Sequence, residues 1–138
     1  MAKKIPVSQL MTQKVIVANT TTKFSDIIEF FDLYKIQHLP VAENDQLIGI
    51  VSINDIMKFL STKLMAGNAM NLASLNATFN IKEVMTLNPV SVNPDDDFSK
   101  VVEILSMGKF QSVPVVKDGL LVGIVTNKDV VKIYGEDL

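Results

Sequence analysis

The chain has 138 residues, of which 48% are hydrophobic and 20% are charged, which suffices for one or two small domains with a buried core. Thirteen lysines, no arginine and fifteen acidic residues give a formal net charge of −2, and no basic run interrupts this mixture. We therefore do not expect nucleic acid as the main partner. A phosphate site has to use lysine, histidine, hydroxyl or backbone groups. The absence of cysteine excludes a disulfide framework and a thiolate nucleophile.

Neither the N-terminal residues nor the length of the apolar runs indicates secretion or a membrane-spanning helix. The first residues, Met1 to Pro6, lack the apolar stretch of a secretory signal. No uninterrupted run of about 18 apolar residues follows them, which is the length that a spanning helix needs. We therefore expect a cytoplasmic protein without a membrane segment.

The sequence is a tandem repeat. A shift of 74 positions aligns residues 7–60 with residues 81–134 without a gap. Identical pairs under this shift include Met11/Met85, Thr12/Thr86, Pro40/Pro114, Gly49/Gly123 and Asp55/Asp129. We place repeat 1 at 5–66, a linker at 67–79 and repeat 2 at 80–138. Because one copy has too little apolar surface for a core of its own, we expect the two to share one core as a pseudo-twofold pair.

Each copy opens with a short apolar run and a helix. The runs, residues 15–17 and 90–92, predict strands, and Thr22 and Asp96 are the expected N-caps of the helices that follow. Apolar residues then recur at helical spacing, as Phe24, Ile27, Ile28 and Phe31 in the first copy and as Phe98, Val101, Val102 and Leu105 in the second. Gly108 suits the C′ position that ends the second of these helices.

Two strands and a second helix complete each copy. In the first copy, residues 39–42 and 46–53 predict a β-hairpin with a turn at 43–45, and Asp118-Gly119 is the matching turn of the second copy. The closing helices are expected over residues 54–63 and 127–134. The predicted fold is therefore α+β, with two β-α-β-β-α repeats whose small sheets pack against helices.

The segment between the copies, residues 61–80, is not a simple hydrophilic linker. Small and amide residues alternate there with Met65, Met70, Leu72, Leu75 and Phe79. One interpretation is that these apolar side chains pack against the core of the pair. The other is that they form a contact between subunits.

The strongest candidate site lies where the second strand of each hairpin meets the following helix, at residues 49–55 and 123–129. Free backbone N–H groups and the positive end of the helix favour an anion there. A hydroxyl three residues before a carboxylate, Ser52 before Asp55 and Thr126 before Asp129, suits a phosphate beside a ribose diol. The same residues are equally well explained as helix caps. From the residues alone, both interpretations stay open.

The repeated motifs resemble the CBS domain family, and the tandem pair resembles a complete Bateman module. The motifs are Leu10-Met11-Thr12, Leu39-Pro40-Val41 and Gly49 to Asp55, repeated as Val84-Met85-Thr86, Val113-Pro114-Val115 and Gly123 to Asp129. The resemblance implies a cleft with two related sites for an adenosine-containing ligand, such as AMP, ADP, ATP or S-adenosylmethionine. It implies no other cofactor.

The resemblance also assigns roles by position. Asp55 and Asp129 would hold ribose hydroxyls, Ser52 and Thr126 would lie near phosphate, and the base would lie against the opening strand of the opposite repeat, residues 12–16 or 86–90. The implied ligand-binding set is Ser52, Asn54, Asp55, Thr126, Lys128, Asp129, Thr12, Val15, Ile16, His38, Pro40, Thr86, Val90, Ser112 and Pro114. Where the family often offers His or Arg to phosphates, this chain has His38 in one copy and Ser112 in the other, which argues against a triphosphate preference.

Two polar features have alternative explanations. His38 is the only histidine, and a lone imidazole is as well explained by a structural role as by ligand contact. The triplet at residues 95–97 resembles a cation site, but helix capping explains it adequately, and the oxygen spacing of a calcium loop is absent. We therefore predict no metal.

The sequence does not predict an enzyme. It contains no G-x-S-x-G elbow, no phosphate-binding G-x-x-x-x-G-K-[ST] loop and no G-x-G-x-x-G pattern. We therefore expect a regulatory module in which an adenosine ligand bridges the repeats and changes what a separate effector protein contacts. The alternative is a ligand-free, dimeric interaction or scaffold domain. The resemblance implies a homodimer in either case, and leaves open the ligand, the effector and the direction of regulation.

Overall fold

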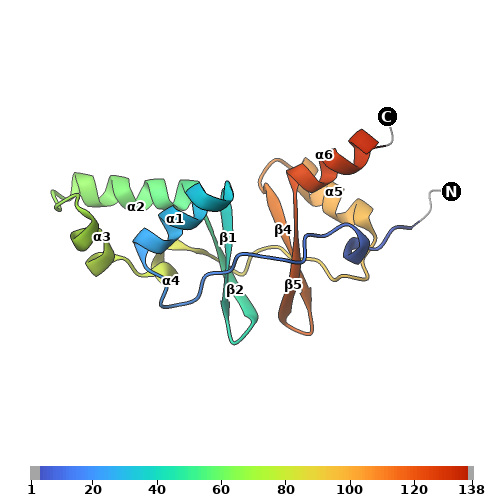
Figure 1. Cartoon of the computed structure of the whole chain (residues 1–138), viewed down its shortest axis with the longest axis horizontal. Helices are drawn as coiled ribbons and strands as arrows, with labels where there is room; N and C mark the ends of the chain where they lie inside the picture. Colours follow the sequence, from blue (N-terminus) through green and yellow to red (C-terminus); the bar gives the residue numbers. More distant parts are fainter. Residues whose placement is uncertain (1–3, 137–138) are drawn as a thin grey trace. The chain divides into compact units, whose positions relative to one another are not determined.

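The computed structural model describes residues 4–136, and side-chain burial up to Ile133 (Figure 1). The chain divides into two compact units. The central unit consists of residues 16–44 and 48–88. The terminal unit consists of the described residues up to 15, residues 45–47 and the described residues from 89 onward. The opening segment of each sequence repeat therefore belongs to the unit that holds the hairpin of the other repeat.

The central unit contains four helices and a small sheet. Its elements in chain order are α1 (Phe24–Tyr34), β1 (His38–Glu43), β2 (Gln46–Ser52), α2 (Ile53–Met65), α3 (Leu72–Thr78), α4 (Ile81–Val84) and β3 (Thr86–Leu87). Strand β1 is hydrogen-bonded to β2. Strand β3 pairs antiparallel with β2, with Gly49 opposite Leu87 and Ile50 opposite Thr86. This register places the start of repeat 2 on the hairpin of repeat 1.

The core of the central unit joins both helices of the first repeat to the inter-repeat segment. Ile27, Leu39, Val41 and Val51 are completely buried. The rings of Phe24, Phe59 and Phe79 form a cluster with centroid separations of 5.6, 5.9 and 5.1 Å. Aromatic pairs at these distances add about 0.5–1.5 kcal/mol beyond the burial of their area.

The terminal unit repeats the arrangement with fewer elements. They are the 3-10 helix η1 (Val7–Gln9), α5 (Phe98–Ser106), β4 (Ser112–Lys117), β5 (Leu120–Thr126) and α6 (Asn127–Glu136). Strands β4 and β5 are antiparallel, with Val113 opposite Val125. The buried side chains of Val7, Val101 and Val115 lie in the core of this unit. The N-terminal segment is attached to α5, because Phe98 N–H donates to the carbonyl of Ile5 at 2.8 Å.

Both hairpins turn through residues with positive φ. Asn44 and Asp45 join β1 to β2 with φ of 51° and 64°, and Asp118 and Gly119 join β4 to β5 with φ of 53° and 82°. Two successive left-handed residues match the right-handed twist of the flanking strands, and Asn, Asp and Gly adopt that conformation most readily. The predicted hairpins are confirmed, although Glu43 belongs to β1 rather than to the turn.

The prediction of opening strands at residues 15–17 and 90–92 is wrong. Residues 15–17 form no bridge, and residues 90–92 form only an isolated parallel bridge of Val92 with Val115, which Ala18 matches by an isolated bridge with Val41. A longer ladder would need the N–H groups of Pro40 and Pro114 as its next donors, and proline has none. The pairing therefore stops after one bridge in each unit.

The predicted N-caps are each one residue too early. Helix α1 starts after Lys23 and α5 after Asp97, whose carboxylate accepts from Ser99 N–H. Thr22 and Asp96 instead accept hydrogen bonds from the N–H groups three residues before them, at 2.9 and 2.8 Å, and so stabilise the preceding turns. Gly108 at φ 74° confirms the predicted end of α5.

The inter-repeat segment divides between the two interpretations. Leu75 is 7% exposed, and Phe79 packs against the same core. Met65 is 85% exposed, and about half of the surface of Met70 and Leu72 is exposed as well. The side chain of Asn76 on α3 accepts from Ser25 N–H and so caps the start of α1, at 3.0 Å. Part of the segment is therefore core and part is free apolar surface. None of the described helices is long and apolar enough to cross a bilayer.

Candidate functional site

The first candidate site is the N-terminus of α2, where Ser52 and Asp55 form a capping box. Ser52 N–H donates to Asp55 Oδ2 at 2.9 Å, and Asp55 N–H donates to Ser52 Oγ at 3.1 Å. Ser52 has extended backbone angles, so the chain leaves strand β2 and enters the helix at this residue. The capping interpretation is therefore correct for this pair, and it uses one oxygen of the carboxylate.

The N-terminus of α6 repeats this box with an additional contact. Thr126 N–H donates to Asp129 Oδ2 at 2.9 Å, and Asp129 N–H donates to Thr126 Oγ1 at 3.3 Å. The hydroxyl of Thr12 donates to the same carboxylate, 3.1 Å from Oδ1 and 3.3 Å from Oδ2. The structure thus brings together Thr12, Thr126 and Asp129, although 117 positions separate the outer two in sequence.

Thr12 reaches this position because its backbone pairs with β5. Thr12 N–H donates to the carbonyl of Ile124 at 2.8 Å, and Ile124 N–H donates back to Thr12 at 3.0 Å. Thr86 occupies the equivalent place in the central unit, opposite Ile50. The side chains before them, Met11 and Met85, cover glycines of the same strands.

His38 and Ser112 begin β1 and β4, one strand away from the helix starts. Ser112 pairs with Thr126, is 5% exposed, and its hydroxyl has no hydrogen-bond partner among the described residues. Burial lowers the pKa of the His38 imidazole, while the charge of Asp55 opposes that shift. The two positions therefore give the two helix starts different electrostatic surroundings, one ionisable and one neutral.

In the described part of the chain, the side chains of the other predicted ligand residues make no hydrogen bond to the capping residues of α2 and α6. Asn54 and Lys128 lie exposed on the first turns of their helices. Pro40 and Pro114 are buried, and their carbonyls accept from Ala18 and Val92. The remaining positions are Val15, which is half-buried, Ile16, which packs against the central core, and Val90, which is exposed.

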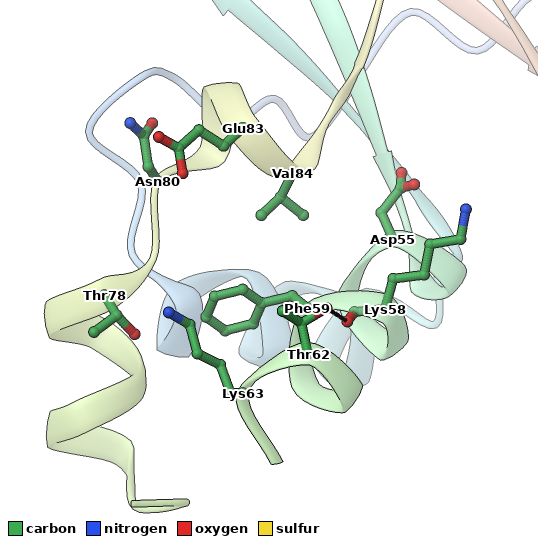
Figure 2. Close-up of a pocket in the computed structure, with 9 residues that line it drawn as sticks. All are labelled: Asp55, Lys58, Phe59, Thr62, Lys63, Thr78, Asn80, Glu83 and Val84. Atoms are coloured by element: carbon green, nitrogen blue, oxygen red, sulfur yellow. Dashed lines mark hydrogen bonds between the residues drawn. The ribbon is translucent and has the colours of Figure 1, made fainter. Parts of the chain in front are cut away.

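A pocket of about 300 Å³ lies beside α2 and was not predicted from the sequence (Figure 2). Its lining residues are Asp55, Lys58, Phe59, Thr62, Lys63, Thr78, Asn80, Glu83 and Val84. Figure 2 shows Asp55 and Lys58 at one end, with the ring of Phe59 between them and Lys63. The ammonium of Lys63 lies 5.6 Å from the centre of that ring. The helical spacing of the lining residues on α2 was the signal in the sequence that could have indicated this face. The rest of the pocket depends on tertiary packing, because α3 and α4 close it.

The described residues contain no cluster of three or more potential metal ligands. In the acidic triplet, Asp96 accepts from Asn93 N–H, and Asp97 accepts from Ile5 N–H at 2.9 Å. A backbone hydrogen bond from Asn93 lowers the pKa of Asp96, and a hydrogen bond from Ser99 lowers that of Asp97. The triplet thus holds turns and the N-terminal segment in place.

Two hairpin-and-helix repeats, each with a carboxylate in the first turn of its closing helix, define a class of tandem modules. The sequence matches the CBS domain family over residues 7–62 and 81–136, and the chain belongs to this family as a tandem CBS pair. Both the resemblance and the α+β fold inferred from the sequence are thereby confirmed.

Similar structures have been solved with adenosine ligands. The fold resembles that of CBSX2 from Arabidopsis thaliana in complex with AMP, with a TM-score of 0.79 and 26% identity over 96% of this chain and 97% of that chain. It also resembles the CBS domain pair of protein MJ0100 in complex with 5'-methylthioadenosine and S-adenosyl-L-methionine, with a TM-score of 0.78 and 25% identity over 99% of this chain and 100% of that chain.

Among curated proteins, the chain is 31% identical over 129 residues to protein MJ0188 of Methanocaldococcus jannaschii, covering 93% of this chain and 43% of that protein. It spans less than half the length of the first curated relatives that it matches. One of these relatives is a homoserine O-acetyltransferase of Methanohalobium evestigatum, of which the matched part is 24%. CBS pairs are thus found within longer chains, including enzymes.

Proposed function

We propose that the protein is a regulatory module that binds an adenosine-containing ligand, AMP, ADP, ATP or S-adenosylmethionine, at the starts of α2 and α6. The observation that carries this proposal is the convergence of Thr12, Thr126 and Asp129 at the N-terminus of α6. Nearby, the buried hydroxyl of Ser112 lacks a partner within the described residues, and a ligand or water at this helix start could supply one. The AMP and S-adenosylmethionine complexes of similar CBS pairs support the same ligand class.

The chemistry of these residues suits a nucleoside with a short anionic group. A carboxylate accepts hydrogen bonds from both hydroxyls of a ribose, because it offers several lone pairs and no proton. The first-turn N–H groups and the helix dipole favour a negative group beside it. Since the chain has no arginine, the cations close to these helix starts in sequence are single lysines such as Lys58 and Lys128. This composition favours a monophosphate or a sulfonium ligand over a triphosphate.

A dimeric interaction domain with empty helix starts is the alternative function. Exposed apolar side chains on helices favour it: Ile28 and Leu33 on α1, Met57 on α2, and Val131 on α6. A homodimer that covers such surfaces is compatible with both functions. Analytical ultracentrifugation tests this expectation, and a monomer at all concentrations would contradict the homodimer.

Calorimetric titration of AMP, ADP, ATP and S-adenosylmethionine into the parent protein tests the ligand-binding proposal. Asp55→Asn and Asp129→Asn remove one carboxylate charge each and keep an oxygen that can accept the capping bond. A hydrogen bond to a charged group contributes about 1.5–3 kcal/mol, so each variant should bind about 10- to 100-fold more weakly at one site.

Asp26→Asn is the matched control, because it removes a carboxylate that caps α1, where it accepts from Lys23 N–H at 3.2 Å, and Asp26 lies outside the implied ligand-binding set. It should bind nearly as the parent does. If no ligand bound up to millimolar concentration, the scaffold alternative would replace the proposal. If both Asn variants bound like the parent, the assignment of the two aspartates would be wrong.

A further inference from the structure

The two first-turn carboxylates are alike in the oxygen that caps the helix. In both, Oδ2 accepts the N–H group three residues earlier, from Ser52 in one case and from Thr126 in the other, each at 2.9 Å. The cap therefore leaves Oδ1 of each aspartate as the oxygen for an additional donor. Because Oδ1 accepts no hydrogen bond from the cap, it is the oxygen with more free lone pairs for a ribose hydroxyl at either helix start.

The two Oδ1 atoms differ in the hydrogen bonds that they accept. Asp129 Oδ1 accepts the hydroxyl of Thr12 at 3.1 Å. Within residues 4–133, no protein donor reaches Asp55 Oδ1, and Thr86, the counterpart of Thr12, makes no hydrogen bond to Asp55. This difference exists although Thr12/Thr86 and Asp55/Asp129 are identical pairs of the repeat.

Thr12 is well placed to hold this contact. Its backbone exchanges two hydrogen bonds with Ile124, so the Cα position is fixed relative to β5, and only rotation of the side chain is free. A hydrogen bond to a charged acceptor is stronger than one between neutral groups. An incoming ribose hydroxyl therefore has to displace Thr12 or share the carboxylate with it.

We propose that Thr12 sets the affinity of the Asp129 site by competing with the ligand for Oδ1, so that the Asp55 site fills first. The inference rests on the proposed function, because it concerns the same adenosine ligand. The Asp55 side chain also lines one end of the pocket beside α2 (Figure 2). The two sites thus have graded affinities despite their repeated sequence.

AMP titrations of single-site proteins test the proposal directly. In the Asp55→Asn background, only the Asp129 site keeps its carboxylate, and adding Thr12→Val removes the hydroxyl while it preserves the β-branched shape. We expect AMP to bind about 2- to 10-fold more tightly to Thr12→Val than to the background, because Thr12 is exposed and water weakens its bond to the carboxylate below the value of a buried charged hydrogen bond. Thr12→Ser keeps the hydroxyl and should bind like the background.

The comparison variant is Thr86→Val in the Asp129→Asn background, where we expect no gain in AMP affinity, because Thr86 makes no hydrogen bond to Asp55 within the described residues. Weaker or unchanged AMP binding by Thr12→Val would overturn the proposal, since the hydroxyl would then assist the ligand or be irrelevant to it. An equal gain for Thr86→Val would also overturn it, because both sites would then behave alike.

A measurement without ligand separates the inference from the proposed function. In a double-mutant cycle of urea unfolding, Thr12→Val and Asp129→Asn should be coupled by about 2- to 10-fold in the unfolding equilibrium constant, while Thr86→Val and Asp55→Asn should be additive. Absent coupling of the first pair would refute the Thr12 contact even if AMP bound. Coupling in a parent that binds none of AMP, ADP, ATP and S-adenosylmethionine would leave the contact intact and reject the ligand class, and with it the competition.

Discussion

The sulfur of Met85 lies 2.5 Å from the position that a Cβ on Gly49 would occupy. Met11 has the same relationship to Gly123, at 2.6 Å. In each unit, the methionine that opens one repeat therefore packs on a glycine in the strand of the other repeat. Only a residue without a side chain permits this approach, which also brings the threonine after each methionine onto the same strand.

Gly49→Ala should destabilise the central unit. The new methyl group would meet Met85 and also the backbone carbonyl of Thr86, 2.9 Å from the Cβ position, and the backbone cannot yield as easily as the side chain. Overpacking of this kind costs about 1–3 kcal/mol, to be measured as the free energy of unfolding in urea. Gly49→Ala combined with Met85→Ala should be less destabilised than the sum of the single variants. Simple additivity would show that the two residues do not meet.

Phe79→Ala should destabilise the protein more than any change at the exposed end of the inter-repeat segment. The ring of Phe79 packs against Phe24 and Phe59, and removal of a buried phenylalanine costs about 3–5 kcal/mol, less where the side chain is only partly buried. Met65→Ala is the control, because Met65 is 85% exposed and its loss should change the free energy of unfolding by less than about 0.5 kcal/mol. A large effect of Met65→Ala at high protein concentration alone would instead indicate a contact between subunits.

The protein should lose stability in mild acid through His38. Burial lowers the pKa of this imidazole in the folded state, so the unfolded chain binds more protons once the pH falls below about 6.5. The free energy of unfolding therefore decreases as the pH falls from about 6.5 through the folded pKa, and it does not change for this reason above that range.

Comparison with His38→Gln isolates this contribution, since the variant lacks the titrating group. We expect the stability of the parent to fall relative to that of the variant below about pH 6.5. Asp55→Asn should lower the pKa of His38 further, as observed by NMR titration, because the charge of Asp55 favours the protonated ring. A parallel pH dependence of parent and His38→Gln would show that His38 titrates alike in both states.

Ser112→Ala should leave the ligand-free protein equally stable or stabilise it. The Ser112 hydroxyl is buried without a partner in the described structure, and an unpaired buried polar group costs about 1–3 kcal/mol. Removal of the oxygen relieves that cost and leaves a cavity of only one atom. Urea unfolding measures the difference, and Ser52→Ala, which loses a cap worth about 1 kcal/mol, shows the opposite sign. Marked destabilisation by Ser112→Ala would reveal an unseen partner.

Most secondary structure was predictable because it rests on contacts over a few residues. The hairpins follow from Asn44-Asp45 and Asp118-Gly119, and the helices from their apolar spacing. The one-residue error at Thr22 and Asp96 arose because both types of residue also stabilise turns, and the sequence does not show which N–H they accept. The absence of opening strands could not be predicted, because the sequence does not show that these segments lie beside Pro40 and Pro114.

The sequence by itself determined the two repeats, the positions of Asp55 and Asp129 at the starts of helices, and the resemblance to the family, because these depend on residues close together in the chain or on a repeated pattern. Only the tertiary structure decided the burial of the Ser112 side chain, the pocket beside α2 and the contact of Thr12 with Asp129. Two matching sequence patterns predict similar surroundings for the two aspartates. They acquire different ones here because a contact across 117 positions depends on how the whole chain packs.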